Sequence, residues 1–229
     1  MIKPDGGNSH TSAALLEVLV AGGHGHVALR LLRRLAERGD VARGLIRNPD
    51  HADDLERLGA RPVLADLEHE DITAAVAGAD AVVFAAGAGP GSGPERKRTV
   101  DLGGALKLIE AARANGIRRY LMVSSIGADD PAAASEQMRP YLEAKAEADE
   151  ALQASGLDYT IVRPGRLTDE EGTGLVEVAP GLGRRGAIPR DDVAATLLAC
   201  LDIETTIGKT FELLAGETPI QDALSRLTG

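Results

Sequence analysis

The sequence is poor in cysteine and in aromatic residues. Cys200 is the single cysteine among 229 residues, so an intrachain disulfide and a cysteine-based metal site are excluded, as expected of a protein of the reducing cytoplasm. Aromatic residues account for 2% of the chain, whereas hydrophobic residues account for 44%. We therefore expect a globular protein with a core of aliphatic side chains, and we expect Cys200 to be buried within the apolar segment 193–201.

Positive charge and long apolar runs are also scarce. The formal net charge of -10 argues against general nucleic-acid binding, which needs a basic face. The apolar stretch 13–21 is too short to cross a bilayer, which takes about 20 residues, and Lys3 alone is a poor flank for a signal peptide. We expect neither nucleic acid nor a membrane as a partner. The histidines lack metal-ligand spacing, so no metal is expected: His24 and His26 belong to a glycine-rich turn, and His10, His51 and His69 are expected at the surface.

A strand, a glycine-rich turn and a helix follow one another near the start of the chain. The apolar segment 17–21 breaks into Gly22, Gly23 and Gly25, and an amphipathic segment begins at Val27. This order is typical of a dinucleotide-binding βαβ unit, in which the glycines allow a sharp turn and a close approach of the pyrophosphate. The helix that opens there offers unpaired N–H groups and the positive end of its dipole. An ordinary tight turn between a strand and a helix is the alternative interpretation.

Strand and helix patterns alternate along the rest of the chain. This alternation predicts an α/β Rossmann fold, with a doubly wound, mainly parallel sheet of about seven strands in a single domain, residues 16–229. Residues 1–15 are polar and are expected to form a flexible leader. The glycine-rich segment 166–185, with a short strand at 176–178, is expected to serve as a small substrate lid. Asp191 is expected to cap the helix that follows. The other expected strands are 41–46, 63–65, 81–86, 119–125, 157–162 and 211–214, and the expected helices are 48–58, 72–77, 99–115, 138–154, 193–201 and 219–227.

Arg47, at the end of the second predicted strand, bears on the choice of cofactor. A site specific for NAD usually has Asp or Glu at this position, where the carboxylate accepts hydrogen bonds from the adenosine ribose. A guanidinium there can instead bind a 2′-phosphate, which favours NADP over NAD. A solvated loop arginine is the alternative.

Three other features lie near the expected carboxyl edge of the sheet. Asp66 follows the third predicted strand, where it either accepts from the adenine amino group or caps the next turn. The glycine–proline segment 87–94 either lets the cofactor pass close to the backbone or is a flexible linker. Asp101 is expected simply to favour the dipole of the helix that it begins.

Tyr141 and Lys145 form the second informative pattern. Their i, i+4 spacing places both side chains on one face of the predicted helix 138–154. An ammonium beside a phenol lowers the phenol pKa, so the tyrosine can exchange a proton with a substrate oxygen. Ser125, at the end of the fifth predicted strand, can hold that oxygen by a hydrogen bond. Such tyrosine–lysine pairs also occur on helices as mere surface packing.

Taken in order, these motifs resemble the atypical short-chain dehydrogenase/reductase superfamily, in its small NAD(P)H-binding, epimerase/dehydratase-like subgroup. The resemblance covers about residues 16–226. The segments that carry it are Gly22–Ala28, Leu45–Asn48, Val82–Gly87, Val123–Ser125, Tyr141–Lys145, Asp158–Gly165, Glu171–Gly174 and Arg190–Ala194.

The resemblance implies a catalytic set of Ser125, Tyr141 and Lys145 that assists hydride transfer to or from a nicotinamide. Tyr141 is the implied acid/base, and Lys145 also binds the nicotinamide ribose. Arg163, Pro164 and Gly165 are implied to lie near the nicotinamide end. The residues expected to bind the cofactor are Gly22, Gly23, His24, Gly25, His26, Val27, Arg47, Asp66, Leu67, Ala85, Ala86, Gly87, Ser124, Lys145, Arg163, Pro164 and Gly165.

The chain departs from the sugar-epimerase relatives in two respects. Ser125 and Tyr141 are only 16 positions apart, and the larger C-terminal substrate domain is missing, so a nucleotide-sugar substrate is not expected. We expect an NADP-dependent oxidoreductase that acts on a small molecule as a monomer or homodimer. A non-catalytic, NADP(H)-sensing regulatory protein is the alternative.

Overall fold

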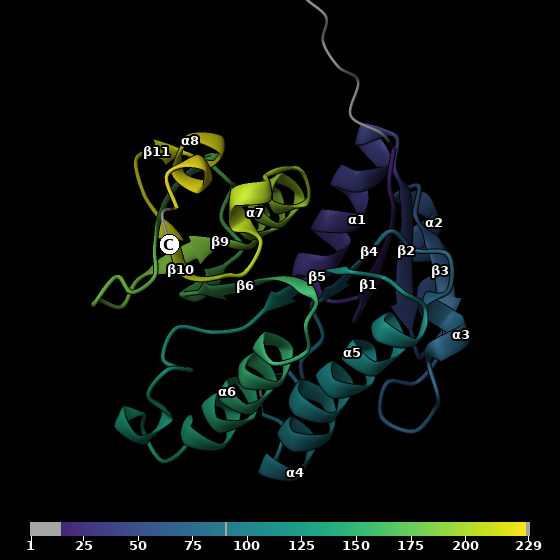
Figure 1. Ribbon diagram of the computed structural model, residues 1–229, viewed down its shortest axis with the longest axis horizontal. Helices are drawn as coiled ribbons and strands as arrows, with labels where there is room; N and C mark the ends of the chain where they lie inside the picture. Colours follow the sequence, from purple (N-terminus) through teal and green to yellow (C-terminus); the bar gives the residue numbers. More distant parts are fainter. Residues whose placement is uncertain (1–14, 90, 228–229) are drawn as a thin grey trace, which may run out of the picture.

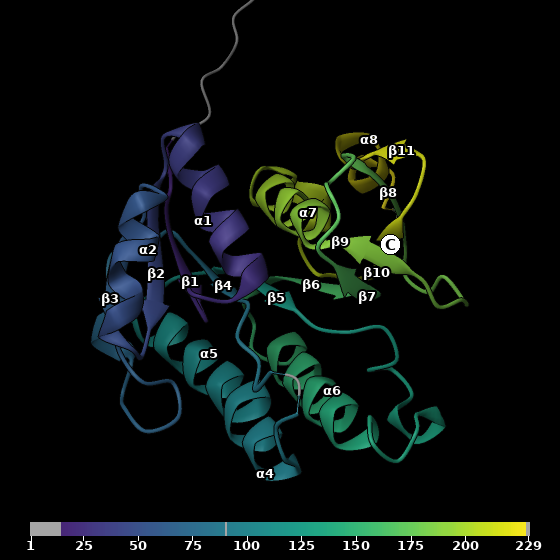
Figure 2. The same ribbon diagram turned by 180° about the vertical axis from the view of Figure 1, so that it is seen from behind.

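The computed structural model describes residues 15–89 and 91–227, and it contains one large sheet between two layers of helices (Figure 1). Helices α1 (His26–Arg38) and α7 (Arg190–Asp202) lie on one face of the sheet. Helices α5 (Ala105–Ala114) and α6 (Arg139–Gln153) lie on the other, and the view from behind agrees (Figure 2). The prediction of an α/β Rossmann fold is thus confirmed. The expected leader, residues 1–15, falls outside the described residues except for Leu15.

The large sheet has nine strands in the order β11-β8-β10-β6-β5-β4-β1-β2-β3. The expected mainly parallel sheet is present, but it has more than the seven strands that the sequence predicted. Seven strands run parallel, from β3 at one edge to β10. Two more strands extend the sheet beyond β10: β8 pairs antiparallel with β10, and β11 pairs antiparallel with β8. The seven strands that pair in parallel are β1 (Glu17–Ala21), β2 (Val41–Ile46), β3 (Arg61–Leu64), β4 (Ala81–Phe84), β5 (Arg119–Val123), β6 (Asp158–Pro164) and β10 (Lys209–Ala215), and the two added strands are β8 (Leu175–Ala179) and β11 (Thr218–Pro219).

The segment expected to form a lid contains the predicted strand at 176–178, now β8, and one strand that was not predicted, β7 (Arg166–Thr168). Strand β7 pairs in parallel with β9 (Ala187–Pro189) in a separate two-stranded sheet. Strand β8 pairs with β10, where Leu213 lies opposite Val178. The weak periodicity of this segment arises because short edge strands bury few side chains, so only the apolar 176–178 pattern was visible in the sequence.

The strands separate two apolar layers. The first holds the inner faces of α1, α7, α8 (Ile220–Ser225) and α2 (Ala52–Arg57), and includes the predicted buried Cys200. The second holds α5, α6 and α3 (Thr73–Val76). Side chains of β1 alternate between them, with Val18 and Val20 in one layer and Leu19 in the other. This two-sided burial explains why the central strands are apolar throughout.

The helix boundaries differ from expectation in two places. The long helix predicted for 99–115 is preceded by α4 (Pro94–Arg96) and begins as a π-helical segment, η2 (Lys97–Gly104), before α5. Helix α7 begins at Arg190 with Pro189 at the capping position, so Asp191 is not its N-cap but lies in its first turn. Among the described residues, no helix has the length and the apolar composition of a membrane span. The remaining short helices are η1 (Pro49–His51), η3 (Pro131–Ala133) and η4 (Glu204–Thr206).

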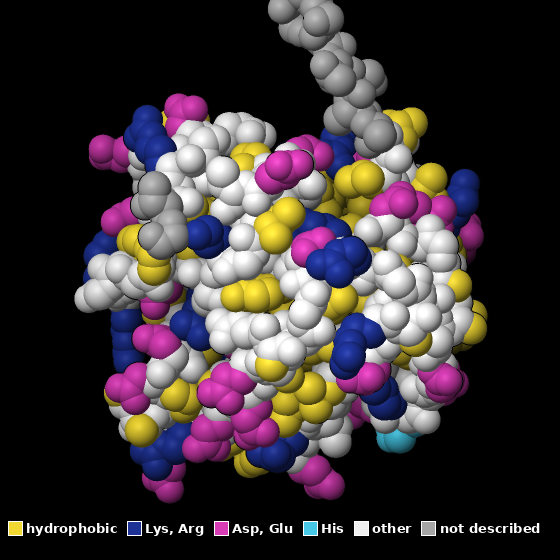
Figure 3. All heavy atoms as spheres, in the orientation of Figure 1, with side chains coloured by type: hydrophobic (Ala, Val, Ile, Leu, Met, Phe, Trp, Pro, Cys, Tyr) yellow, Lys and Arg dark blue, Asp and Glu magenta, His cyan; other side chains and the backbone are white. Residues whose placement is uncertain are grey.

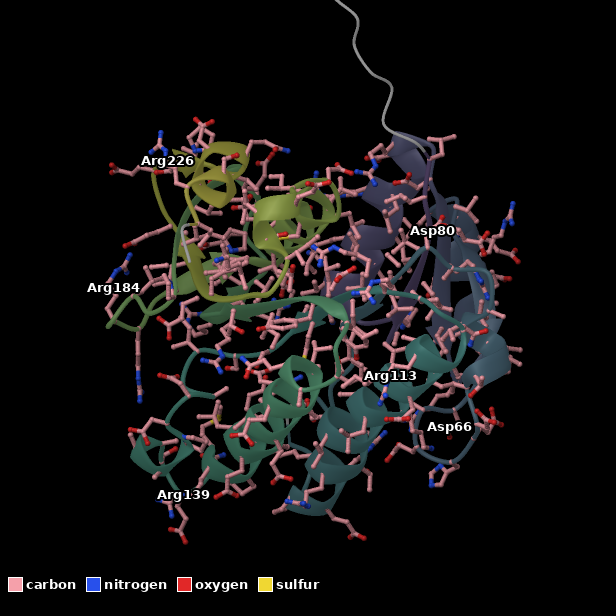
Figure 4. The ribbon with its side chains drawn as sticks, in the orientation of Figure 1. Asp66, Asp80, Arg113, Arg139, Arg184 and Arg226 are labelled. Carbon is pink, nitrogen blue, oxygen red and sulfur yellow. The ribbon has the colours of Figure 1, made fainter. Side chains whose placement is uncertain are left out.

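The chain order places the ends of β1 and β4 beside each other at the carboxyl edge of the sheet. Strands β2 and β3 continue to one side of β1, whereas β4, β5 and β6 continue to the other. Asp66 lies just beyond β3 at this edge, and Asp80, which precedes β4, lies at the opposite end of the strands (Figure 4). Open α/β sheets bind ligands where the strand order reverses in this way, so the region after β1 and β4 is the place to look for a site.

Candidate functional site

A groove of about 290 Å³ lies at this edge of the sheet. Ten of the residues predicted to bind a cofactor line it: Gly22, Gly23, His24, Gly25, Arg47, Asp66, Leu67, Ala85, Ala86 and Gly87. They come from four different loops, which follow β1, β2, β3 and β4. The groove also has walls that the sequence analysis did not assign to a site: Leu45, Ile46, His51, Ala65, Glu68, Arg96 and Val100.

The glycine turn fits closely against its neighbours. Gly22 has a φ of 80°, a conformation that favours glycine, and a Cβ there would lie 2.6 Å from the Cα of Ala86. The N–H of Gly25 donates to the carbonyl of Gly22 at 2.8 Å, which closes the turn. Gly25 is also the N-cap of α1, and no side chain among the described residues caps that end. The first N–H groups of this thirteen-residue helix therefore have no side-chain acceptor, and the helix begins next to Gly25, which lines the groove. Such a helix start is suited to binding an anion.

Two histidines form one wall of the turn. The ring of His24 stacks on that of His51, with centroids 3.6 Å apart, and its Nε2 lies 2.7 Å from Asp54 Oδ2. Hydrogen bonding to His24 lowers the pKa of the Asp54 carboxyl. The expectation that His51 is a plain surface residue was wrong, because the turn of η1 brings its half-buried ring onto His24. The expected residues His26 and Val27 do not line the groove: His26 begins α1 and is exposed, and Val27 is buried in the core.

Arg47 reaches across the groove to the loop after β3. Its Nη1 lies 3.0 Å from Glu68 Oε2, and Arg96 Nη2 lies 3.8 Å from the same oxygen. The Thr99 hydroxyl donates to Glu68 Oε1 at 2.7 Å. The sequence analysis missed Glu68 and Arg96, since neither follows directly on a strand. A cluster of this kind can bind a charged group at the adenosine end of a dinucleotide.

Asp66 is held by its own turn. Its Oδ1 accepts from the N–H of Glu68 at 2.7 Å, and its Oδ2 lies 3.2 Å from His69 Nδ1. Burial raises its pKa, but the hydrogen bonds from Glu68 and His69 outweigh this and the pKa of Asp66 falls below its usual value. The predicted capping role is therefore visible in the structure, and Asp66 lines the groove as well.

Lys145 is the most firmly held charge near the groove. Its ammonium lies 3.2 Å from Asp101 Oδ1 and donates to the carbonyl oxygen of Val123 at 3.1 Å. It also lies 5.8 Å from the ring centroid of Tyr141 and 5.4 Å from that of Phe84. Burial by itself lowers the pKa of Lys145. The charges of Tyr141 and Asp101 raise it by more than burial lowers it, so the pKa of Lys145 lies above its usual value. The predicted tyrosine–lysine contact is thus present on α6.

Asp101 was expected only to favour a helix dipole, and this was wrong. It is buried in η2, where its Oδ2 accepts from the N–H of Ala88 at 3.0 Å while its Oδ1 faces Lys145. Asp101 thereby connects Lys145 to the loop of Gly87, which lines the groove. The signal was an acidic residue within the apolar face of an amphipathic helix, where only a paired charge is tolerated.

A second buried acid continues the line of α6. Tyr141, Lys145 and Asp149 follow one another at intervals of four, a spacing that could have revealed Asp149. Its Oδ2 accepts from Ser124 Oγ and from Arg163 Nε, each at 2.9 Å. Burial raises the pKa of Asp149, although Arg163 and Ser124 lower it.

The other predicted residues lie at the ends of β5 and β6, outside the groove. Ser124 and Arg163 face Asp149, and Ser125 Oγ donates to the carbonyl of Ile126 at 3.2 Å. A Cβ atom on Gly165 would lie 2.4 Å from Leu214 Cδ2 and 2.6 Å from the carbonyl oxygen of Gly186. Glycine is therefore needed at this position for close packing. Pro164 lies in β6 and is buried.

The parts present fit a dinucleotide. The groove combines a free helix start, a glycine turn and a polar far end, and the Asp101–Ala88 contact leads from it to the tyrosine–lysine pair. Such an arrangement can bind a pyrophosphate at α1 and hold a proton at the Tyr141 oxygen beside the ligand.

Comparisons with known proteins agree with this geometry. The model of the NAD(P)H-binding family matches residues 22–204. The uncharacterized sugar epimerase YhfK of Bacillus subtilis (strain 168) is 44% identical over 215 residues, which cover 93% of this chain and 100% of that protein.

Two solved structures extend the comparison. A Bacillus halodurans protein provisionally assigned as an NAD-dependent epimerase/dehydratase is 46% identical, with a TM-score of 0.89 over 93% of this chain and 100% of that one. ChuY, an anaerobillin reductase from Escherichia coli O157:H7, is 25% identical, with a TM-score of 0.73 over 86% of this chain and 96% of that one. The chain belongs to the NAD(P)H-binding family, and its similar proteins include ones named as a sugar epimerase and as an NAD-dependent epimerase/dehydratase.

Proposed function

We propose that the protein is an NADP-dependent oxidoreductase that acts on a small carbonyl or hydroxyl compound with Ser125, Tyr141 and Lys145. The observation that carries the proposal is the contact between Lys145 and Tyr141, 5.8 Å from ammonium to ring centroid, next to a groove built for a dinucleotide. When bound, the nicotinamide group would supply a hydride to a carbonyl or accept one from an alcohol. Tyr141 holds or releases the proton at the substrate oxygen, and the ammonium of Lys145 favours its phenolate form.

The remaining residues bind and orient. The N–H groups at the start of α1 and the glycine turn bind the pyrophosphate, and Arg47 binds the 2′-phosphate by charge-assisted hydrogen bonds. Ser125 Oγ orients the substrate oxygen by exchanging its hydrogen bond to Ile126 for one to the substrate. Asp101 keeps the Lys145 ammonium beside the groove.

A non-catalytic, NADP(H)-sensing regulator is the second candidate. It is favoured by the ion pair of Lys145 with Asp101, which neutralises the charge that activates the tyrosine, and by the turn of Ser125 Oγ toward its neighbour's carbonyl. In that case the groove binds cofactor and no substrate is turned over.

The test begins with binding and continues with turnover. Calorimetry with NADPH and NADH on the wild type and Arg47→Ala is expected to show tight NADPH binding that weakens in the variant, while NADH changes little. A panel of carbonyls, quinones, flavins and linear tetrapyrroles then tests NADPH oxidation.

Tyr141→Phe is expected to lower turnover by about 10²–10⁴-fold, whereas Tyr159→Phe, a half-buried tyrosine of β6, serves as the control. Full activity of Tyr141→Phe would rule out the proton role. Cofactor binding without turnover of any compound would favour the regulator, and no binding of either dinucleotide would overturn both candidates.

A further inference from the structure

Glu68 is the acidic centre of the adenosine end of the groove. Two arginines and a hydroxyl converge on its carboxylate: Arg47 Nη1 at 3.0 Å, Arg96 Nη2 at 3.8 Å and Thr99 Oγ1 at 2.7 Å. In the described part of the chain, Arg47 and Arg96 pair with no other acid. We call these four residues the Glu68 cluster.

The carboxylate is fixed, whereas the arginines are free to move. Only 12% of the Glu68 side chain is exposed, compared with 55% for Arg47 and 44% for Arg96. The backbone of Glu68 is anchored on both sides, because its N–H donates to Asp66 Oδ1 at 2.7 Å and its carbonyl accepts from Lys107 Nζ at 2.7 Å. A ligand that enters the groove can therefore recruit the guanidinium groups but cannot easily displace the carboxylate.

We propose that Glu68 sets the discrimination between phosphorylated and unphosphorylated dinucleotides, by competing with the 2′-phosphate for Arg47 and Arg96. This inference rests on the proposed binding of a dinucleotide in the groove. A phosphate that reaches the arginines must break the hydrogen bond of Arg47 to Glu68 and the longer ion pair of Arg96 with Glu68. The phosphate then also lies near the negative charge of the Glu68 carboxylate, so Glu68 weakens NADPH binding. An unphosphorylated ribose carries no charge to be repelled and leaves the ion pairs intact.

Arg96 is the second phosphate ligand in this arrangement. It comes from α4, after the glycine–proline loop, and reaches the same carboxylate oxygen as Arg47. Two guanidinium groups directed at one oxygen form an anion site that is occupied internally until a stronger anion replaces the carboxylate.

The experiment compares Glu68→Gln with Glu95→Gln by calorimetry, using NADPH and NADH. Both variants remove one negative charge, but Glu95 is an exposed residue of α4 next to Arg96 and is not part of the Glu68 cluster. Glu68→Gln is expected to bind NADPH about three- to tenfold more tightly and NADH no more tightly than the wild type. Glu95→Gln is expected to leave the NADPH-to-NADH ratio within about twofold of the wild type.

Two further measurements make the test independent of any effect of Glu68→Gln on folding. Arg96→Ala, on an exposed side chain, is expected to weaken NADPH binding about three- to tenfold and NADH binding little. Adenosine 2′,5′-bisphosphate and AMP serve as probes of the adenosine end alone. The ratio of their affinities is expected to change among the variants in the same way as the NADPH-to-NADH ratio.

The outcomes separate the two proposals. If the wild type binds both dinucleotides but the ratio is the same in Glu68→Gln and Glu95→Gln, or NADPH binds more weakly in Glu68→Gln, the role of Glu68 is overturned and the proposed function stands. If the wild type binds neither dinucleotide, the proposed function fails and this inference fails with it.

Discussion

Two polar clusters lie near the carboxyl edge of the same sheet, and they differ in burial. The Glu68 cluster is open, with 55% of the Arg47 side chain exposed. The second cluster, which we call the Lys145 cluster, consists of Asp101, Ser124, Lys145, Asp149 and Arg163. The exposed fractions of its central pair are 3% for Lys145 and 1% for Asp101.

The difference in burial separates the proposed recognition of the cofactor from the proposed chemistry. Exposed ion pairs exchange partners at little cost, so the Glu68 cluster is suited to the part of a ligand that varies. Buried ion pairs are costly to break, so the Lys145 cluster holds its groups in one geometry beside the proposed site of reaction. On the face of the molecule in Figure 3, Asp and Glu side chains lie beside Lys and Arg side chains in several places, as expected of exposed ion pairs.

The largest expected effect comes from breaking the buried pair. Lys145→Met leaves the Asp101 carboxylate buried without its partner, which is expected to cost about 3–5 kcal/mol in the free energy of unfolding. Urea unfolding measures the loss.

The double variant Asp101→Asn, Lys145→Met is the control. It removes both charges, so most of the lost stability is expected to return, because a neutral pair carries no uncompensated charge. A double variant as unstable as the single one would show that the ion pair is not the cause.

A pH series on Asp149→Asn tests the role of burial in the Lys145 cluster. Burial raises the pKa of Asp149 above its ordinary 3.8. The folded state then binds this proton more tightly than the unfolded state, so the contribution of Asp149 to stability is complete below its unfolded pKa and is lost as the pH rises through its folded pKa. The wild type is therefore expected to lose stability relative to Asp149→Asn as the pH rises above about 4, where the carboxyl is ionised in the unfolded state but still protonated in the folded state.

The exposed Asp53→Asn serves as the matched control, and its difference from the wild type is expected to stay level over the same pH range. If the wild type instead became more stable relative to Asp149→Asn as the pH rises, the effect of Arg163 and Ser124 on the pKa of Asp149 would outweigh that of burial.

Breaking the exposed cluster is expected to have a small effect on stability. Arg47→Ala should change the free energy of unfolding by less than about 0.5 kcal/mol, because more than half of the side chain is exposed and its ion pair is screened by water. Thermal and urea unfolding measure this. A loss of stability above about 2 kcal/mol would show that the ion pair of Arg47 behaves energetically like the buried pairs of the Lys145 cluster.

Salt should affect the two clusters differently, with the smallest changes of the series. Between about 0.05 M and about 0.5 M salt, the NADPH-to-NADH affinity ratio is expected to fall, because screening weakens the exposed arginines. The stability lost in Lys145→Met is expected to change little over the same range, since the buried charges are screened much less. If the affinity ratio and the stability loss depended equally on salt, the two clusters would not differ in how strongly water and ions screen their charges.

Much of the fold could be predicted because local patterns agree with it. Strand β2 lies at the predicted residues 41–46, and the helix predicted for 138–154 is α6 (Arg139–Gln153). The strand predicted for 176–178 is present as β8, but the prediction was poorer where the burial pattern is weak: β11 is a two-residue edge strand, and the π-helical segment η2 packs against α6. Neither leaves a strong period in the sequence.

The candidate site divides in the same way. The glycine turn and the Tyr141–Lys145 pair could be read from the sequence, since each depends on residues close along the chain. Asp101 with Lys145, and Glu68 with Arg47, lie 44 and 21 positions apart and were not foreseen as partners.

The sequence by itself therefore determined that the sheet is mainly parallel with helices on both faces. It also determined the glycine turn at the groove and the helix face that carries Tyr141 and Lys145. Only the tertiary structure decided which charges are paired and which of those pairs are buried. The physical reason is that period and spacing act within one element, whereas the energy of a charge depends on the dielectric environment and the partners that distant elements bring to it.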